Sequence, residues 1–218
     1  MIYLEDKTPF PSPELASAEG IVAYNFTLTT ERLLEAYHKG IFPWYNEDDP
    51  ILWWSPDPRF VLFPQKLHIS KHMRRMFRKK PYQVTYNQCF EEVITNCARI
   101  TRKDQDGTWI HPEMMQKYAE LHQMGYAQSV EVWKEGTLVG GLYGIKVGNL
   151  FCGESMFSKE NNASQYGFIS FVQENPQLEL IDCQVHSDYL EKLGAEHIPR
   201  RDFLAIVNNN TSPYPINP

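Results

Sequence analysis

The stretch from Ala127 to Met156 constrains the fold most, because its apolar residues alternate with the period of a β-strand and two short turns interrupt it. The strings AQSVEVW, TLVGGLYGIKV and LFCGESMF are separated by Glu135-Gly136 and Gly148-Asn149. Glycine or asparagine at such positions favours tight hairpin connections. The pattern therefore predicts three antiparallel strands that follow one another in a sheet.

The chain after these strands alternates between helical and strand patterns. Residues 162–174 have a helical pattern, LELIDCQV is typical of a buried strand, and SDYLEKLGA is typical of a short helix that ends at Gly194. DFLAIVNN is a final helix or strand. Three strands followed by a helix, a strand, a helix and a last element are the order of an acetyltransferase-type (GNAT-like) α/β domain.

The first 60 residues have a different character. Residues 1–30 are expected to be loop-like, since several prolines hold that segment extended. Thr30 suits the N-cap and Gly40 the C-cap of a helix between them. A segment rich in Pro and Trp follows, which favours an ordered loop or short strands. We therefore expect a small N-terminal α/β domain at 1–58 and a larger α/β domain at 59–218.

Charge is segregated along the chain. The net charge is −6, yet the 33 residues from Pro58 to Phe90 contain eight Lys and Arg and no Asp or Glu. In that window KHMRRMFRKK is predicted to be a helix, capped by Ser70 and ended by Pro81. Its charged face is either an ordinary solvated surface or a surface for the phosphates of RNA or DNA. The clustering of one sign favours phosphate.

Several classes of protein are disfavoured by composition. The sequence has no run of the ~20 apolar residues that span a bilayer, and its first residues lack the pattern of a secretion signal. Four cysteines without paired spacing are expected to be reduced thiols in a cytosolic protein. The seven histidines do not combine with them in a ligand spacing, so no metal is expected.

Four tryptophans, Trp44, Trp53, Trp54 and Trp109, stand in or near the Pro-rich and polar loops. Large aromatic residues usually belong to the core, but an exposed ring can also stack on a nucleobase. Trp109 follows a polar segment with an Asp106-Gly107 turn, which is a poor location for a core residue. The stacking interpretation is therefore stronger for Trp109 than for Trp53 or Trp54.

Polar residues within apolar strands are the candidates for chemistry. In LELIDCQV, Asp182 and Gln184 are two residues apart and should share one face of the strand. Such a pair is either a structural polar pair or a device that holds an amine and takes its proton. Gly153 and Glu154 at the end of another strand could admit a ligand and anchor a cationic or hydroxyl group.

Nine segments together resemble the leucyl/phenylalanyl-tRNA–protein transferase family, and the resemblance covers most of the chain. Several of these segments are weak when taken singly, but nine in one order are very specific. In this chain they are RLLEAYHKGIFPWY, PILWWSPDPRFVLFP, LHISKHMRR, GTWI, LVGGLYGI, LFCGESMFS, NNAS, LIDCQV and LGAEHIPRRDF.

The resemblance implies an aminoacyltransferase with a small N-terminal domain and a GNAT-like domain, without a metal or a nucleotide cofactor. Its members transfer Leu or Phe, and Met less well, from aminoacyl-tRNA to proteins that begin with Arg or Lys. The product is a destabilising N-terminus for the bacterial N-end rule of protein degradation. A monomer in the cytoplasm, without membrane attachment, is expected.

The resemblance also implies roles for residues at matching positions. The catalytic set is Asp182, Gln184 and Glu154, and the aminoacyl side chain is expected against Phe151, Met156, Phe171 and Ile181. The 3′-terminal adenosine is expected near Tyr37, Trp44, Trp109 and Tyr118. The acceptor stem of the tRNA is expected on Lys71, Arg75, Arg78 and Lys79.

Two segments depart from the family pattern. Residues 25–30 are NFTLTT where GGDLSP is usual, so this loop is expected to be built differently. Gln165 follows Asn-Ala-Ser where a lysine is usual, which removes any contact made by that charge.

The expected reaction is aminolysis of an activated ester, which requires no further energy source. In our hypothesis Gln184 positions the amine, Asp182 helps to withdraw its proton and Glu154 helps to hold the substrate's N-terminus. An acyl-CoA acetyltransferase would need a Gly-rich pyrophosphate loop where this chain has SKENNASQYG. A non-catalytic RNA-binding module would leave Asp182 and Gln184 unexplained.

Overall fold

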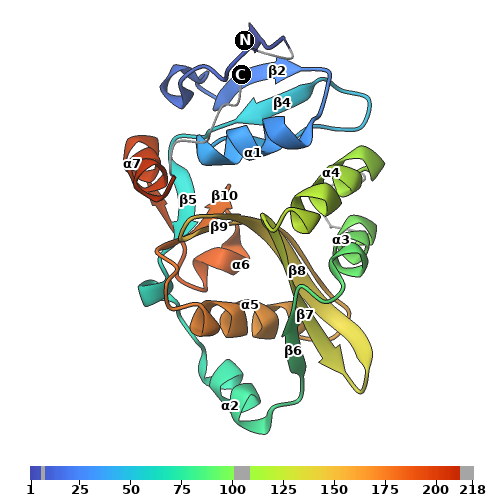
Figure 1. The fold of residues 1–218 in the computed structure, drawn as a ribbon. Helices are drawn as coiled ribbons and strands as arrows, with labels where there is room; N and C mark the ends of the chain where they lie inside the picture. The colour runs from blue at the N-terminus through green and yellow to red at the C-terminus, as the bar shows by residue number, and fades with distance from the viewer. Residues whose placement is uncertain (6–7, 101–108, 212–218) are drawn as a thin grey trace.

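Two β-sheets organise the protein, for which a computed structural model describes residues 1–5, 8–100 and 109–211 (Figure 1). The smaller sheet has the strand order β1-β2-β4-β3. Its strands are β1 (Ile2–Tyr3), β2 (Ile21–Asn25), β3 (Phe42–Pro43) and β4 (Ile51–Trp54). The short helix η1 (Pro13–Leu15) precedes β2, and α1 (Thr30–His38) separates β2 from β3.

The larger sheet has the strand order β11-β5-β10-β9-β8-β7-β6. Its strands are β5 (Arg59–Leu62), β6 (Gln83–Tyr86), β7 (Ala127–Lys134), β8 (Thr137–Val147), β9 (Leu150–Ser158), β10 (Leu180–Gln184) and β11 (Glu196–Ile198). The expected three antiparallel strands are β7, β8 and β9, so that prediction is confirmed. β10 pairs parallel to β9 and antiparallel to β5.

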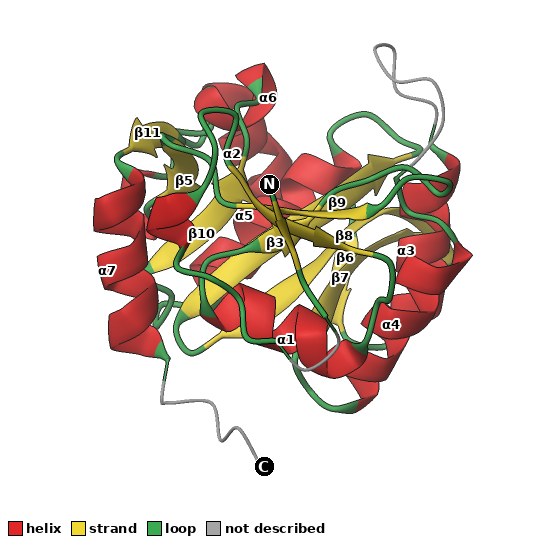
Figure 2. Cartoon of the chain, turned by 90° about the horizontal axis from the view of Figure 1, so that it is seen from above, coloured by secondary structure: helices red, strands yellow, loops and turns green. Residues whose placement is uncertain are grey.

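Helices lie around the larger sheet (Figure 2). They are α2 (Lys71–Lys79), α3 (Phe90–Arg99), α4 (Pro112–Gln123), α5 (Ala163–Glu174), α6 (Asp188–Glu191) and α7 (Arg200–Asn210), with the short helix η2 (Pro64–Lys66) after β5. The order β7-β8-β9-α5-β10-α6-β11-α7 follows the one predicted for a GNAT-like α/β domain, with the short strand β11 as an additional element, and the predicted fold class is confirmed. The last element, left open as helix or strand, is the helix α7.

The structure corrects two expectations for the N-terminal segment. Residues 1–30 are not loop throughout, because β2 pairs with β4 in the middle of the smaller sheet. The N-cap of α1 is Thr29 and not Thr30: the Thr29 side chain accepts the backbone N–H of Arg32 at 3.1 Å. The cap expected for α2 is confirmed, since the Ser70 hydroxyl accepts the N–H of Met73 at 3.2 Å.

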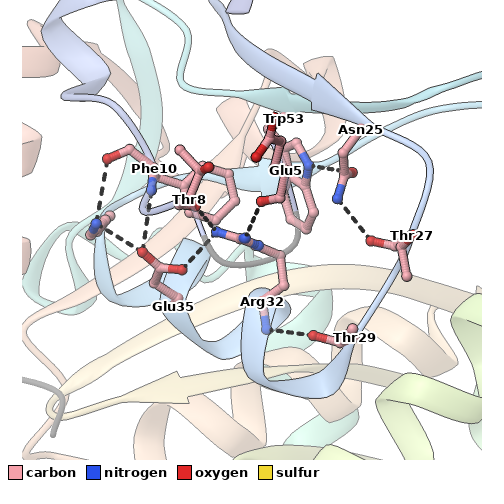
Figure 3. A network of polar contacts seen from close by, with 10 residues as sticks. Glu5, Thr8, Phe10, Asn25, Thr27, Thr29, Arg32, Glu35 and Trp53 are labelled. Atoms are coloured by element: carbon pink, nitrogen blue, oxygen red, sulfur yellow. Dashed lines mark hydrogen bonds and ion pairs between the residues drawn. The ribbon is translucent and has the colours of Figure 1, made fainter. Parts of the chain in front are cut away.

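The beginning of the chain is held against α1 by Arg32 (Figure 3). Its guanidinium donates to the carbonyl oxygens of Thr8 at 2.6 Å and Glu5 at 3.1 Å, and pairs with Glu35 at 3.0 Å. Only 7% of the Arg32 side chain is exposed. Because a buried guanidinium needs acceptors, these hydrogen bonds hold Glu5 and Thr8 close to α1.

One apolar core joins the two sheets. Leu33 of α1, Trp53 of β4, Val61 of β5 and Leu150 of β9 all belong to one cluster of buried side chains. The change from one sheet to the other falls between Trp54 and Arg59. A boundary at residue 58 between two domains therefore remains a proposal that the change of sheet supports. Among the helices described here, none combines the length and apolar character needed to cross a membrane.

Candidate active site

A cavity of about 320 Å³ opens where β9 and β10 meet the segment after β3. Its walls come from elements far apart in the sequence: Phe42 to Trp44, Trp109, the part of β9 between Phe151 and Met156, and the end of β10 with the start of α6. Parallel pairing of β10 with the first residues of β9 places the end of β10 beside the middle of β9. Nine of the residues singled out from the sequence line this cavity: Trp44, Trp109, Phe151, Gly153, Glu154, Met156, Ile181, Asp182 and Gln184.

A β-bulge in β9 directs Glu154 into the site. Along the β8–β9 ladder Tyr143 pairs with Ser155 and Gly144 with Gly153, so Glu154 between them has no partner residue on β8. An extra residue of this kind bends the strand and changes the direction of its side chain. Glu154 can therefore face the cavity although the strand on either side pairs regularly.

A second irregularity lies at the end of β10. Asp182 pairs with Val61 of β5 and Gln184 pairs with the adjacent Phe60, which leaves Cys183 as the extra residue. Gln184 has a φ of 66°, in the left-handed region that residues other than Gly rarely adopt. Strained backbone of this sort is concentrated at functional sites. The simple alternation expected for Asp182 and Gln184 is thus interrupted by the bulge.

Glu154 is the centre of a chain of hydrogen bonds. Its carboxylate accepts from the side-chain amide of Gln184 at 2.7 Å and from the hydroxyl of Tyr118 at 3.0 Å. The hydroxyls of Tyr118 and Tyr37 are bonded to each other at 2.5 Å. Burial raises the pKa of Glu154 from 4.5 to about 7, against the hydrogen bonds of the two tyrosines and of Gln184, which lower it.

Asp182 has a different environment. The guanidinium of Arg59 donates to both of its carboxylate oxygens, at 2.8 and 2.7 Å, and the backbone N–H of Gln184 donates to one of them at 2.9 Å. Both side chains of the ion pair are at most 2% exposed. Arg59 also lies over the rings of Phe42 and Phe203, at 4.7 and 4.5 Å from the ring centres. The pair is part of the core as well as of the site.

The apolar side of the cavity agrees in part with the set expected for an aminoacyl side chain. Phe151, Met156 and Ile181 line it. The fourth residue of that set, Phe171, lies behind Phe151, with the two ring centres 4.6 Å apart. Phe168 and Leu142 line the cavity and were not singled out from the sequence, because an apolar residue in a helix or strand carries no sign of which cavity it faces.

The four aromatic residues expected near the adenosine occupy two layers. Trp44, 39% exposed, and Trp109 lie at the cavity wall. Tyr37 and Tyr118 are at most 2% exposed and lie beneath, where burial and the charge of Glu154 raise the pKa of both hydroxyls. Trp53 is fully buried and donates its indole N–H to Asn25 at 3.0 Å. The Asp106-Gly107 turn lies outside the described residues.

The basic residues on α2 form an exposed surface. Met73 anchors the helix in the core, and the ring of Phe77 stacks on Tyr166 of α5 at 4.2 Å. Figure 1 shows α2 beyond α5, at the end of the molecule opposite the smaller sheet. The α2 basic face consists of Lys71, Arg74, Arg75, Arg78 and Lys79, all exposed. Arg59, from the same acid-free window, is buried and so does not belong to this surface.

One group of potential metal ligands occurs among the described residues. His186, Asp188 and Glu191 have ligand atoms within 4.8 Å of one another. His186 lies 3.8 Å from Asp188 and 3.7 Å from Glu191, and all three side chains are exposed. Loose ion pairs of this kind are common on protein surfaces.

The sequence matches two family models. Residues 61–208 match leucyl/phenylalanyl-tRNA protein transferase, and residues 26–57 match the N-terminal domain of that family. A leucyl/phenylalanyl-tRNA–protein transferase of Christiangramia forsetii is 53% identical over 94% of this chain and 98% of its own length. One of Flavobacterium johnsoniae is 51% identical over 96% of this chain and its full length.

Similarity to solved structures is lower. A conserved protein of unknown function from Bacteroides thetaiotaomicron has a TM-score of 0.43 and 15% identity, over 62% of this chain and 53% of its own. The family models, by contrast, match both parts of the sequence, and two relatives match nearly all of it at about half identity. The chain belongs to the leucyl/phenylalanyl-tRNA–protein transferase family.

Proposed function

We propose that this protein transfers Leu, Phe and, less well, Met from aminoacyl-tRNA to the α-amine of proteins that begin with Arg or Lys. The enzyme is an aminoacyltransferase, and the new N-terminal residue marks the acceptor for degradation by the N-end rule. Its place of action is the cytoplasm, where charged tRNA is available. We further propose that it works as a monomer, which light scattering on the purified protein tests.

One observation carries the assignment: a single cavity combines an apolar wall, a polar wall and an aromatic rim. Phe151, Met156 and Ile181 suit an apolar side chain that is unbranched at Cβ, and Met adapts between Leu and Phe. The rings of Trp44 and Trp109 suit the terminal adenosine. A donor held by both would present its ester to Glu154 and Gln184, which line the same cavity.

The polar wall supplies what aminolysis requires. A free α-amine has a pKa of ~7.7–8.0, so much of it is protonated at neutral pH and must lose a proton before or during attack. The set of Glu154, Asp182 and Gln184 acts on this amine, with Gln184 positioning it. Much of the acceleration comes from holding amine and ester together in the cavity.

The acceptor stem is proposed to lie on the α2 basic face. Five exposed cations on one short helix can neutralise several phosphates without reading bases. The matching residues of the family pattern are Lys71, Arg75, Arg78 and Lys79. Tyr37 and Tyr118 contribute from beneath the adenosine, by holding the polar wall.

An acyl-CoA acetyltransferase is a weaker candidate. Such an enzyme holds the pyrophosphate of its cofactor on free backbone N–H groups at the start of a helix. In this chain the N–H of Ser164 donates to the Ser158 hydroxyl at 2.9 Å, and that of Ala163 to the carbonyl of Glu160 at 3.2 Å. Two of the backbone N–H groups at the start of α5 are therefore already bonded to neighbouring residues.

The test uses radiolabelled Leu-tRNA and a peptide that begins with Arg. We expect leucine to be joined to the peptide, and no product with a peptide whose α-amine is acetylated. Acetyl-CoA in place of Leu-tRNA separates the acetyltransferase, which would acetylate the Arg peptide. Tight binding of Leu-tRNA without transfer would instead identify an RNA-binding module and refute the proposed function.

A further inference from the structure

The two carboxylates of the site differ in what holds them. Both carboxylate oxygens of Asp182 accept hydrogen bonds from the guanidinium of Arg59, a permanent positive charge. One oxygen of Glu154 accepts from the side-chain amide of Gln184 and the other accepts from the hydroxyl of Tyr118, and both donors are neutral. Pairs of acidic groups with contrasting surroundings are how a site separates a proton acceptor from a group that stays ionised.

Asp182 is poorly placed to take a proton. Protonation would leave Arg59, 1% exposed, with a buried charge that has lost its counter-ion. The carboxylate also holds the backbone N–H of Gln184, directly at the strained residue. These contacts are those of a group that fixes the end of β10 and the backbone of Gln184.

Glu154 is better placed in three respects. It lines the cavity, it is directed there by the bulge in β9, and its neutral donors leave it able to gain a proton without stranding a charge. Burial raises its pKa to about 7, so near neutral pH it exchanges a proton readily in either direction. A general base works best when its pKa lies near the working pH.

Groups from several elements interact with Glu154. Tyr118 of α4 and Gln184 of β10 contact it directly, and the hydroxyl of Tyr37 on α1 lowers its pKa. The charge of Asp182 raises it, and the Arg59 guanidinium lies on the far side of that carboxylate. The thiol of Cys152 also interacts with Glu154, and the hydroxyl of Tyr143 interacts with Tyr118.

We propose that Glu154 takes the proton of the attacking amine, and that Asp182 is a positioning residue which acts through Arg59 and the backbone of Gln184. This assignment rests on the function proposed above, and it moves the role of proton acceptor from Asp182, where sequence reasoning put it. Because the Gln184 amide donates to Glu154, its carbonyl oxygen is the atom that can accept a hydrogen bond from the amine.

The steps balance with the groups at hand. The amine nitrogen forms a bond to the ester carbonyl carbon, and its proton passes to the carboxylate of Glu154. The bond from that carbon to the ribose oxygen then breaks, and the ribose oxygen receives the proton from Glu154 and leaves as a hydroxyl. Glu154 is again a carboxylate, and the product is a peptide bond.

The pH dependence of kcat/KM for an Arg peptide tests the assignment in three variants. Well below pH 7 the wild-type kcat/KM should fall tenfold per pH unit for each of two protons. One of these protons is on Glu154 and the other is on the peptide amine. Glu154→Gln should lose about 10²–10⁴-fold in rate and fall for one proton only. Asp182→Asn should be slower than wild type but keep the two-proton dependence. Affinity for a hydrolysis-resistant aminoacyl-adenosine amide reports whether each variant keeps its donor site.

A hydroxyl deletion makes the test independent of whether Glu154→Gln folds. Tyr118→Phe removes a hydrogen bond that lowers the pKa of Glu154, so the lower of the two ionisations should move to higher pH. Tyr45→Phe deletes another buried hydroxyl, outside this hydrogen-bond chain, and should leave the profile unchanged.

The outcomes separate this inference from the function on which it rests. A two-proton profile in Glu154→Gln, a loss of less than tenfold, or an unmoved ionisation in Tyr118→Phe overturns the role of Glu154 while transfer itself stands. A one-proton profile in Asp182→Asn returns the role to Asp182. If the wild type fails to transfer at any pH, the proposed function is refuted, and this role with it.

Discussion

Asp182 and Arg59 are 123 positions apart in the sequence, yet they form a bidentate ion pair at 2.7 and 2.8 Å that is closed off from solvent. The pair joins β10, which bears the polar wall of the cavity, to β5 at the start of the larger sheet. Removal of either partner therefore affects folding as well as the site.

The first prediction concerns this pair. Asp182→Ala should lower the free energy of unfolding by about 3–5 kcal/mol, because it leaves the Arg59 guanidinium buried without a counter-ion. The double variant Arg59→Met with Asp182→Leu should lose clearly less free energy of unfolding than Asp182→Ala alone. Urea denaturation of the three proteins measures both effects. Equal losses in single and double variants would show that packing, and not the charge, dominates.

The second prediction uses the ionisation of Glu154 without any substrate. Its pKa rises from 4.5 to about 7 on folding, so between these pH values a larger fraction of Glu154 is protonated in the folded state than in the unfolded state. Stability from this group is therefore present at low pH and is lost as pH rises through 7. Glu154→Gln, which does not titrate, should gain on the order of 3 kcal/mol relative to wild type between pH 4.5 and pH 8. Denaturation of both proteins at the two pH values gives this difference, and a constant difference would contradict the raised pKa.

The third prediction contrasts two glycines that pair with each other across β8 and β9. A Cβ on Gly153 would meet only the carbonyl oxygen of Asp182, at 3.8 Å, whereas one on Gly144 would collide with the carbonyl of Cys152 and the ring of Phe151. Gly153→Ala should fold normally but place a methyl group in the cavity and lower kcat/KM for the donor about tenfold. Gly144→Ala should instead be destabilised by about 2 kcal/mol. Thermal unfolding and transfer assays separate the two.

The fourth prediction concerns the donor. A cavity walled by Phe151, Met156 and Ile181 suits Leu and Phe, but a branch at Cβ widens the side chain close to its ester. Val-tRNA and Ile-tRNA should be at least about tenfold poorer donors than Leu-tRNA, which is the usual cost of one misplaced methyl group in an apolar pocket. Competition between labelled donors measures the ratio directly. A rate from Val-tRNA equal to that from Leu-tRNA would contradict this model of the pocket.

The fifth prediction concerns the α2 basic face. Arg75→Glu with Arg78→Glu should raise KM for every aminoacyl-tRNA alike and should reduce the log–log salt slope by roughly one unit for each phosphate contact that is lost. A small aminoacyl-adenosine donor does not reach α2, so its use should be almost unchanged. If transfer from both donors fell to the same extent, α2 would support the fold and not the acceptor stem. The matched control, Lys146→Glu on β8, changes a charge away from this face.

Much of the fold could be predicted because long elements repeat their apolar pattern over several turns or pairs. β7, β8, β9 and α2 are examples, and the cap of α2 is encoded by the serine at position 70. The strand β2 was missed, since its five residues lie in a segment rich in loop-forming residues and depend on β4 for pairing.

Most of the candidate site residues line one cavity, but the sequence could not indicate their geometry. Arg59 was counted only as one of the basic residues of the acid-free window, because charge in a sequence does not indicate burial and its partner lies far along the chain. The alternation of Asp182 and Gln184 suggested one shared face, whereas the bulge at Cys183 is set by pairing with β5 and leaves no mark in the sequence of β10.

Because β9 and β10 each contain an extra residue, the geometry of the site depends on how many residues these strands have as well as on which residues they are. Deletion of Cys183 would let β10 pair regularly with β5 while every proposed catalytic side chain remained in the chain. Regular pairing without Cys183 would place Gln184 out of step with Glu154, whose own position depends on the extra residue in β9. A relative can therefore keep Glu, Asp and Gln and still lack this arrangement if it is one residue shorter in either strand. Comparison of such sequences should count positions between these residues before it compares the residues themselves.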